Sequence, residues 1–356
     1  MTATIAVIIV STIVSCTQDE TPTTNIIKEK TIVFYIVADN NLYAEADSLL
    51  SDLSKSVLSD DNTNILVYVD DLGTPRLYKL HDGYHKLYDY IEMNSLSPNN
   101  LKNILEYISV NFPARENGLI LWSHGSGWIH TDSSVYTRSF GLDSGSIINT
   151  NNLFEILPCY YDYIIFDACY MAAIEVVTDA RKKCGYIVGS PEIVPSMGIM
   201  DRNALNILLH NVPLQERLVE LCNNYVERYK NYTEDISISI CKTEETANLL
   251  EFLANTNYFE ISKIDVSKII SYDFRFYKIF FDIRDVFEKL CIPTQYLDNI
   301  IVFNANGMNN SVRGCGLSVF IPTKQNEIYL DSYKMLNWEK ETLWSEKCIS
   351  STKSIN

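Results

Sequence analysis

The chain contains 356 residues, of which 47% are hydrophobic and 21% are charged, and its formal net charge at pH 7 is −16. This composition supplies enough apolar material for one large domain with additions, or for two domains. The acidic balance, without a basic run or an aromatic-interleaved Lys/Arg stripe, argues against nucleic acid as a partner.

The chain opens with an apolar segment that resembles the signal of a bacterial lipoprotein. The run from Ile5 to Val10 is too short to span a bilayer, but it suits the hydrophobic region of a signal peptide, although no Lys or Arg precedes it. Ser15 stands before Cys16, as in a lipobox. We expect a signal peptide at 1–15, lipidation of Cys16 and a flexible tether at 16–30. The protein would then be exported and anchored to the bacterial outer membrane, facing the periplasm or the exterior. The alternative is a frayed apolar N-terminus of a cytosolic protein.

The other cysteines predict neither a zinc site nor a disulfide framework. The sequence holds nine cysteines and five histidines, without CxxC spacing or a His/Cys cluster. An even number remains after Cys16, which permits disulfides in an exported chain. Most of these cysteines lie in apolar or helical contexts, so we expect buried free thiols for most of them.

Strand-like and helix-like segments alternate through the first part of the chain. Strands are predicted at 31–38, 65–70, 119–123, 162–167 and 186–189. Helices are predicted at 42–58, 99–111, 151–157 and 171–183, and the polar residues 76–92 are typical of a hairpin or edge pair. This alternation predicts a three-layer α/β/α sandwich around a mainly parallel sheet.

The second half of the chain is less regular. Its predicted elements are helices at 205–210, 214–229 and 246–255, strands at 236–241 and 316–322, and a helical region at 327–344. Residues 256–300 carry many aromatic side chains at helical spacing, which we interpret as the core-facing side of a helical subdomain. We therefore predict a helical-rich C-terminal subdomain beside the sandwich.

Two of the predicted strands end in reactive side chains. Residues 119–122 lead into Ser123-His124-Gly125-Ser126-Gly127-Trp128, and residues 163–166 lead into Asp167-Ala168-Cys169-Tyr170-Met171. Parallel sheets bury both faces of such strands and expose polar groups at their carboxyl ends, where ligands bind. His124 and Cys169 are therefore expected to meet across one crevice. A cysteine nucleophile with an imidazole partner is the arrangement of a cysteine peptidase.

The predicted nucleophile needs an activated thiol. A thiol reacts as the thiolate, so Cys169 requires a base or a lowered pKa. His124 supplies the base, and we expect the dipole of a helix beginning near Met171 to favour the thiolate. Gly125 has no side chain, so its backbone N–H can approach a substrate carbonyl. Together with the N–H of Cys169 it would form an oxyanion hole.

These motifs resemble the caspase-like cysteine peptidases, which include caspases, legumains, gingipains and clostripain. The sequences His-Gly-Ser-Gly-Trp at 124–128 and Asp-Ala-Cys-Tyr-Met at 167–171 narrow the similarity to the clostripain family. Further matching stretches are Phe140-Gly141-Leu142-Asp143, Ser190-Pro191-Glu192 and Gly316 to Pro322. We accordingly expect a caspase-like catalytic domain at 31–210 and a C-terminal α/β extension, 211–356, packed on it.

The resemblance implies roles for individual residues. His124 and Cys169 would be the catalytic dyad and would form a thioacyl-enzyme. Asp167 shares a strand face with Cys169 and would line a pocket for a basic side chain, which implies cleavage after Arg and also after Lys. The plainer interpretation of Asp167 is a carboxylate that caps the following helix. Glu192 and Asp201 are candidates for a second acid in the pocket, although the segment ending in Asp201 lacks the family's aromatic residue.

One basic residue between the two motifs suggests an internal substrate. Arg138 is the only Lys or Arg between His124 and Cys169, and it lies in a polar stretch, 131–152, that is typical of an exposed loop. Members of the family are commonly activated by self-cleavage in this region. The resemblance therefore implies cleavage after Arg138 into a light chain and a heavy chain. The alternative is an ordinary surface arginine.

Other functions stay open at this point. One alternative is a caspase-like peptidase of different specificity, for example for Asn, and another is an inactive cell-surface binding lipoprotein on the same scaffold. A serine hydrolase is disfavoured because no Gly-x-Ser-x-Gly elbow occurs. The resemblance implies no required cofactor. Some members need calcium, for which loop acids such as Asp143 would serve, but no EF-hand pattern exists. The expected partners are Arg- or Lys-containing proteins or peptides, the chain itself, and a membrane through the lipid anchor.

Overall fold

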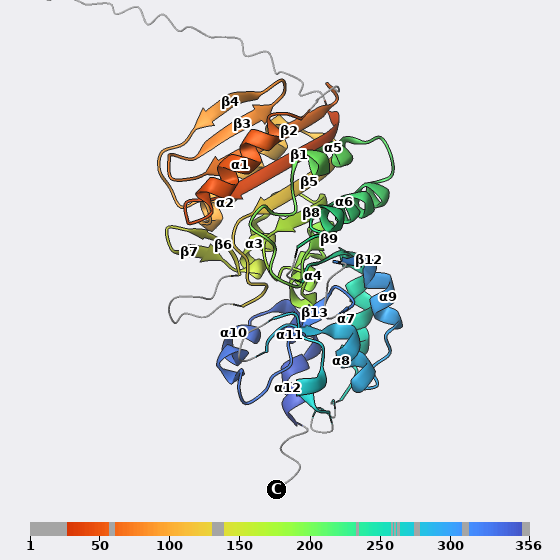
Figure 1. Ribbon diagram of the computed structural model, residues 1–356. Helices are drawn as coiled ribbons and strands as arrows, with labels where there is room; N and C mark the ends of the chain where they lie inside the picture. The colour runs from red at the N-terminus through yellow and green to blue at the C-terminus, as the bar shows by residue number, and fades with distance from the viewer. Residues whose placement is uncertain are drawn as a thin grey trace, which may run out of the picture.

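The protein is built around one twisted sheet (Figure 1). The computed structural model describes residues 27–56, 61–129, 139–232, 235–257, 259, 261, 264–273, 278–307 and 313–350. In spatial order, the described strands of this sheet are β12 (Ile301–Asn306), β10 (Ser237–Lys242), β9 (Cys184–Gly189), β8 (Tyr161–Asp167), β5 (Ala114–Trp122), β1 (Lys28–Val37), β2 (Thr63–Asp70), β3 (Arg76–Leu80) and β4 (Tyr84–Asp89).

The strand directions confirm the predicted fold class. Strands β9, β8, β5, β1 and β2 are parallel to one another. Strands β3 and β4 form the antiparallel hairpin predicted at 76–92, and β10 and β12 are antiparallel at the opposite edge. The sheet is therefore mixed but mainly parallel, as the alternating pattern predicted.

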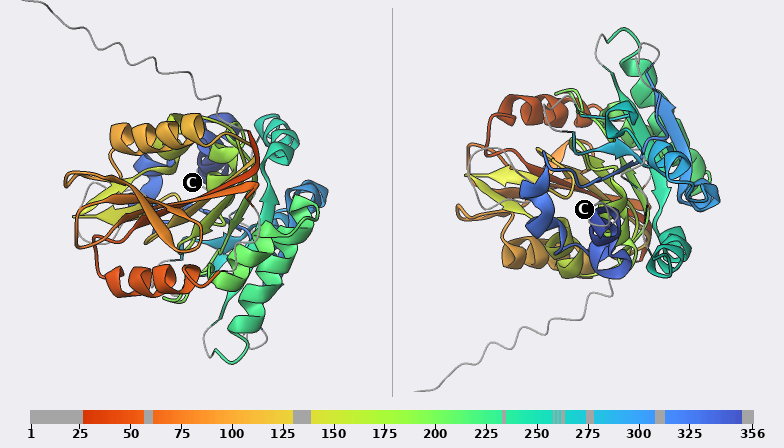
Figure 2. Two further views of the ribbon diagram at one scale, coloured as in Figure 1. Left: turned by 90° about the horizontal axis from the view of Figure 1, so that it is seen from above. Right: turned by 90° about the horizontal axis from the view of Figure 1, so that it is seen from below.

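Helices cover both faces of the sheet (Figure 2). One face carries α2 (Pro98–Asn111), α3 (Thr150–Ile156) and α4 (Ile174–Ala180), and the other carries α1 (Tyr43–Leu53), α5 (Arg202–Leu209) and α6 (Leu214–Arg228). Alternate residues of each inner strand pack into the two cores; in β1, Val33 and Tyr35 face one core, and Ile32 and Phe34 face the other. Burial on both faces explains why these strands are continuous apolar runs.

The C-terminal part of the chain adds short helices and two edge strands. The helices are α7 (Thr246–Ala254), α8 (Ile283–Lys289), α9 (Gln295–Ile300), α10 (Leu330–Tyr333), α11 (Asn337–Thr342) and α12 (Trp344–Ser350). Two small sheets pair β6 (Phe140–Asp143) with β7 (Ser146–Ile148) and β11 (Phe281–Asp282) with β13 (Ser318–Val319). The expected helical-rich C-terminal region is present. No described helix combines the length and apolar character that crossing a bilayer requires, and the cysteines in the described ranges form no disulfide.

The aromatic-rich stretch after residue 256 is less helical than its spacing predicts. In its described part, a 3₁₀ turn at Val266–Lys268 and strand β11 precede α8. Asp273 is fully buried, and its carboxylate accepts the backbone N–H groups of Ile279 and Phe280. These side-chain contacts take the place of helical backbone hydrogen bonds. In the described part of this stretch, the aromatic side chains of Phe259, Tyr272 and Phe280 are buried in the core, without a continuous helix that carries them.

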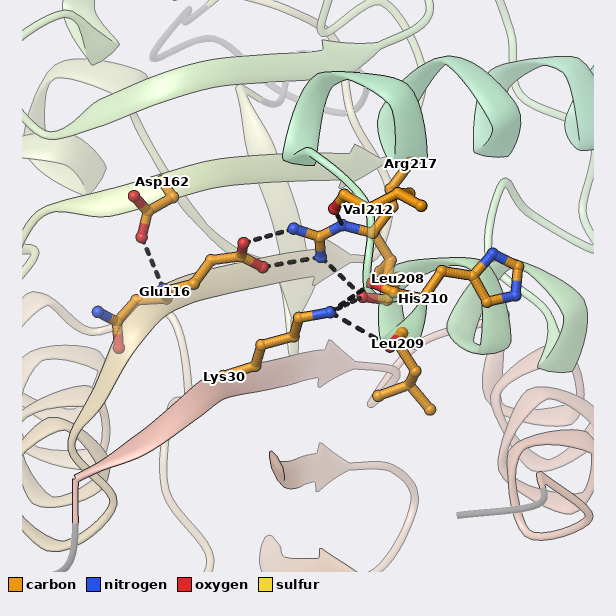
Figure 3. A network of polar contacts seen from close by, with 9 residues as sticks. Lys30, Glu116, Asp162, Leu208, Leu209, His210, Val212 and Arg217 are labelled. Atoms are coloured by element: carbon orange, nitrogen blue, oxygen red, sulfur yellow. Dashed lines mark hydrogen bonds and ion pairs between the residues drawn. The ribbon is translucent and has the colours of Figure 1, made fainter. Parts of the chain in front are cut away.

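A charged network joins the amino ends of β1 and β5 to helices α5 and α6 (Figure 3). The Arg217 side chain is 2% exposed, forms a two-pronged ion pair with Glu116, and donates to the carbonyl of Val212 at 3.0 Å. Lys30 Nζ donates to three carbonyls at the end of α5, those of Leu208, Leu209 and His210, at 3.1, 3.2 and 2.8 Å. Terminal helix carbonyls have no partner within the helix, so these cations satisfy them. Strand β1 begins at Lys28 and includes Lys30, so the last residues of the predicted tether, 16–30, belong to the sheet.

The network gives a stability prediction. Glu116→Gln should lower the free energy of unfolding by about 3 kcal/mol, because it leaves the buried guanidinium of Arg217 opposite a neutral partner. As a control, Lys86→Gln removes the exposed ion pair with Asp89 and should leave stability unchanged within error. Chemical denaturation at neutral pH measures both. Equal, small effects in the two variants would contradict the role given to the network.

Candidate active site

Strands β5 and β8 are adjacent and parallel, and they end level with each other. Trp122 pairs with Asp167 in the register of the two strands, so His124 and Cys169 each lie two residues beyond this pair. Gly125 packs directly on the cysteine. A Cβ at residue 125 would lie 2.6 Å from the carbonyl oxygen of Cys169 and 3.0 Å from its nitrogen. The histidine loop and the cysteine loop therefore lie against each other at the carboxyl edge of the sheet, and only glycine permits this approach.

His124 is half-buried, and its imidazole is held by an asparagine. Nε2 lies 2.8 Å from Oδ1 of Asn41, in the loop after β1. An amide oxygen only accepts hydrogen bonds, so this contact corresponds to an imidazole that carries a proton on Nε2. The loop itself is fixed by Ser123 Oγ, which donates to the carbonyl of Val37 at 2.7 Å, and by Gly141 N–H, which donates to the carbonyl of His124 at 2.9 Å.

Cys169 lies before a tight turn and not at the start of a helix. Tyr170 has φ of 62°, in the left-handed region, and α4 begins only at Ile174. The prediction of a helix beginning near Met171 is therefore wrong. Tertiary contacts explain the difference: Tyr170 N–H donates to the carbonyl of Glu192 at 2.9 Å. The Tyr170 ring also stacks on an aromatic ring of the C-terminal part, 4.7 Å between centroids.

The surroundings of the Cys169 thiol favour its protonated form. Burial raises the pKa of the thiol; the backbone N–H of Val194, 3.3 Å from Sγ, lowers it, and the negative charge of Asp167 raises it again. The net direction is upward, so the resting site holds a thiol at neutral pH. A base must remove its proton before the sulfur can react.

Asp167 is the last residue of β8 and is 3% exposed. Its Oδ1 accepts the N–H of Ile199 at 2.6 Å, and its Oδ2 accepts the N–H of Met200 at 2.8 Å. Gly198, with φ of 76°, packs on the carboxylate, where a Cβ would lie 2.7 Å from Oδ2. Burial raises the pKa of Asp167 to about 6, against the lowering effect of the two N–H groups and of Arg228. The carboxylate binds this loop and not the helix that follows it in sequence.

The two other acidic candidates have different surroundings. Glu192 is 4% exposed, and burial raises its pKa to about 8. Its backbone carbonyl is bound to the cysteine turn, so the segment that carries it lies against Cys169. Asp201 instead has both oxygens engaged. Oδ1 caps α5 by accepting the N–H of Ala204 at 2.7 Å, and Oδ2 pairs with Arg228 at 2.6 Å.

The predicted sites Cys16 and Arg138 lie outside the described residues. Ser139, directly after Arg138, is fully buried. Its carbonyl accepts the N–H of Ser126 at 3.1 Å, and its Oγ donates to the carbonyl of Gly127 at 2.9 Å. Ser139, the residue after the predicted cleavage point, therefore lies against the histidine loop.

Asp143, the acid named above as a calcium ligand, is buried and takes part in a hydrogen-bond network. No group of three or more His, Cys, Asp or Glu side chains in the described ranges is arranged to hold a metal ion. Asp143 is 1% exposed and accepts the backbone N–H of Ser95, whose hydroxyl donates to Asp70. Burial raises the pKa values of both carboxyl groups, that of Asp70 to about 8. Calcium requires six to eight oxygen ligands, which this hydrogen-bonded pair does not offer.

Sequence reasoning missed two side chains that shape the site. Asn41 follows the predicted strand 31–38 by three residues, so the rule about carboxyl ends that selected His124 and Cys169 could also have found it. Arg228 carried no such signal. An arginine at the end of a helix is common, and only the fold shows that it reaches the loop around Asp167.

Comparison with known proteins identifies the family. A model of the clostripain family matches residues 34–291. The chain belongs to the clostripain family. Clostripain from Hathewaya histolytica is 22% identical to it over 419 aligned positions, which cover 88% of this chain and 79% of clostripain. The protein is thus a cysteine peptidase of this family.

Two solved structures are similar to the whole sandwich. A secreted C11 cysteine protease from Bacteroides thetaiotaomicron, in complex with an irreversible peptide inhibitor, has a TM-score of 0.77 and 23% identity, over 89% of this chain and 99% of that one. An inactive zymogen C11 protease from Parabacteroides distasonis has a TM-score of 0.74 and 23% identity, over 89% and 98%. The predicted caspase-like α/β/α fold is confirmed.

The contact between Asn41 and His124 gives a prediction about catalysis. Asn41→Ala should lower kcat/KM about 10- to 100-fold, because the imidazole loses the partner that fixes its tautomer and orientation. Asn100→Ala removes an exposed amide elsewhere and is the matched control. Peptide hydrolysis at neutral pH and thermal unfolding measure activity and folding. Equal activities of the two variants would show that Asn41 does not orient the base.

Proposed function

We propose that the protein is an endopeptidase that cleaves after Arg, and also after Lys, through a dyad of His124 and Cys169. The observation that carries the proposal is that β5 and β8 end at the same level in the sheet and that the backbone of Gly125 packs on that of Cys169. Membership of the clostripain family supports the same reaction class. The bond to Asn41 supports the role of His124, since it fixes the orientation of the imidazole.

The proposed reaction has two stages. As the sulfur of Cys169 attacks the substrate carbonyl carbon, its proton passes to the imidazole of His124. The backbone N–H groups of Gly125 and Cys169 donate to the oxygen on which negative charge develops. The imidazolium then gives its proton to the leaving amine, which produces a thioester. Water, deprotonated by the same imidazole, hydrolyses the thioester and restores the thiol.

Buried acids beside the dyad support a preference for basic side chains. Asp167 and Glu192 are both nearly inaccessible and both belong to segments that contact the cysteine turn. A guanidinium that entered this region would bring a positive charge and further hydrogen-bond donors to these carboxyl groups. Asp201, the other candidate acid, pairs with Arg228. The net charge of −16 adds a general attraction for cationic substrates.

A set of fluorogenic peptides that differ only in the residue before the scissile bond tests this function. We expect turnover of Arg and Lys peptides only, its loss in Cys169→Ala, and a fall in kcat/KM of about 100-fold in Asp167→Asn. Cys291→Ala, at an exposed cysteine, is the control. Because burial raises the pKa of Asp167 to about 6, kcat/KM should fall as the pH drops through that value and the carboxylate is protonated.

Other results of this assay would support the alternatives. Turnover of Asn peptides, abolished in Cys169→Ala, would keep the dyad and replace the specificity. Absence of turnover, together with failure of thiol reagents to label Cys169, would favour an inactive binding lipoprotein on this scaffold.

We also propose that the enzyme activates itself by cleavage after Arg138. Arg138 is the only Lys or Arg between His124 and Cys169, and Ser139, the residue after it, contacts the histidine loop. Arg138→Ala should remain one chain and stay inactive, whereas wild type should yield a heavy chain that begins at Ser139 on N-terminal sequencing. Arg115→Ala, at an exposed arginine, is the control. A single-chain Arg138→Ala protein with full activity would exclude this activation step.

We further propose that the protein is exported and anchored by a lipid on Cys16. The proposal is supported by the apolar run and by the small residue before the cysteine. Cys16→Ser should move the protein from the membrane fraction to the soluble fraction of the cell envelope. An unchanged distribution would count against lipidation.

A further inference from the structure

The segment 198–201 is held between two charged side chains of opposite sign. On one side, the Asp167 carboxylate accepts the N–H groups of Ile199 and Met200. On the other side, Nη2 of Arg228, at the end of α6, donates to the carbonyls of Gly198 and Ile199 at 2.6 and 2.8 Å. These four groups belong to the same two peptide units. Each unit therefore points its N–H at the anion and its carbonyl at the cation.

Arg228 is itself fixed on several sides. Its Nη1 pairs with Asp201 at 2.6 Å, and its guanidinium lies 5.1 Å from the ring centroid of Tyr229. The Tyr229 hydroxyl adds a third bond to the carbonyls of the segment, since it donates to the Gly198 carbonyl at 3.0 Å. At the other end of α6, Arg217 binds the sheet through Glu116. The helix is anchored at both ends, so Arg228 has a defined position relative to the segment.

We propose that Arg228 is a positioning residue for substrate specificity, which holds Asp167 in its charged, oriented state through the two peptide units between them. This inference rests on the proposed function, in which Asp167 binds the basic side chain of the substrate. Two aligned peptide dipoles connect the cation to the anion, and dipoles in a low-dielectric site interact more strongly than in water. In this role Arg228, which binds Gly198, Ile199 and Asp201, would act on the substrate only through Asp167.

The charges around Asp167 determine in which direction its pKa should change when Arg228 or Asp201 is replaced. The titratable groups that face it are Arg228, Asp201, Tyr225, Tyr229 and Cys169. The guanidinium of Arg228 is the cation among them and lowers the pKa of Asp167, whereas the carboxylate of Asp201 raises it. Loss of Arg228 should therefore raise the pH below which Asp167 is protonated, and loss of the Asp201 charge should lower it.

The test is the pH dependence of peptide hydrolysis in four variants. Arg228→Gln should raise KM for Arg peptides about tenfold, leave kcat within about twofold, and move the acid limb of kcat/KM to higher pH. Arg228→Lys keeps the charge without the planar fork, so it should restore the acid limb but not KM. Asp201→Asn, which can still cap α5, should move the acid limb to lower pH. Lys230→Gln, an exposed cation paired with Glu227 near the end of α6, is the charge-matched control and should behave as wild type.

Each outcome decides between the proposals. If Arg228→Gln matches Lys230→Gln in both KM and acid limb, the inference about Arg228 is overturned while the proposed function stands. If Arg228→Gln does not fold, as judged by thermal unfolding, the other two variants decide: a wild-type KM in Arg228→Lys and an unmoved acid limb in Asp201→Asn would overturn it. Wild-type enzyme without turnover of Arg or Lys peptides would overturn the proposed function, and this inference with it.

Discussion

The parallel pairing of β5 with β8 is the constraint on which the candidate site depends. Both strands are buried on both faces, so their polar side chains emerge only where the strands end. Because Trp122 is in register with Asp167, the chain delivers His124 and Cys169 at the same level, and Gly125 lets the two loops touch. A shift of one residue in this register would turn every side chain of one strand to the opposite face.

Buried polar groups at this edge of the sheet bind backbone groups. The thiol of Cys169 accepts an N–H from residue 194, and Asp167 accepts two from the loop at 198–200. Arg228 takes the carbonyls of the same loop. A buried charge without partners is costly, and backbone partners fix its position as well as stabilise it. Through these bonds, loops that are distant in sequence lie beside His124 and Cys169. The surroundings of the site therefore depend on tertiary structure.

The parts that sequence predicted are those decided by local pattern. Buried apolar runs between turn signals leave few alternatives to parallel strands. The two motifs at the ends of β5 and β8 were sufficient to predict His124 and Cys169 as the reactive residues. The start of α4 was not predictable, because contacts of Tyr170 with distant residues impose its left-handed conformation. Arg228 was not predictable either, since no local pattern shows which carbonyls a helix-terminal arginine will reach.

The central claim, that His124 and Cys169 act as one unit, is tested most directly by an irreversible inhibitor. A peptide ending in arginine with a thiol-reactive ketone would be incubated with the protein, and the modified residue located by peptide mapping among its nine cysteines. We expect a single adduct on Cys169 that is lost in His124→Ala, while iodoacetamide at high pH still labels Cys169 in both proteins. An adduct on another cysteine, or one of equal yield in His124→Ala, would contradict it.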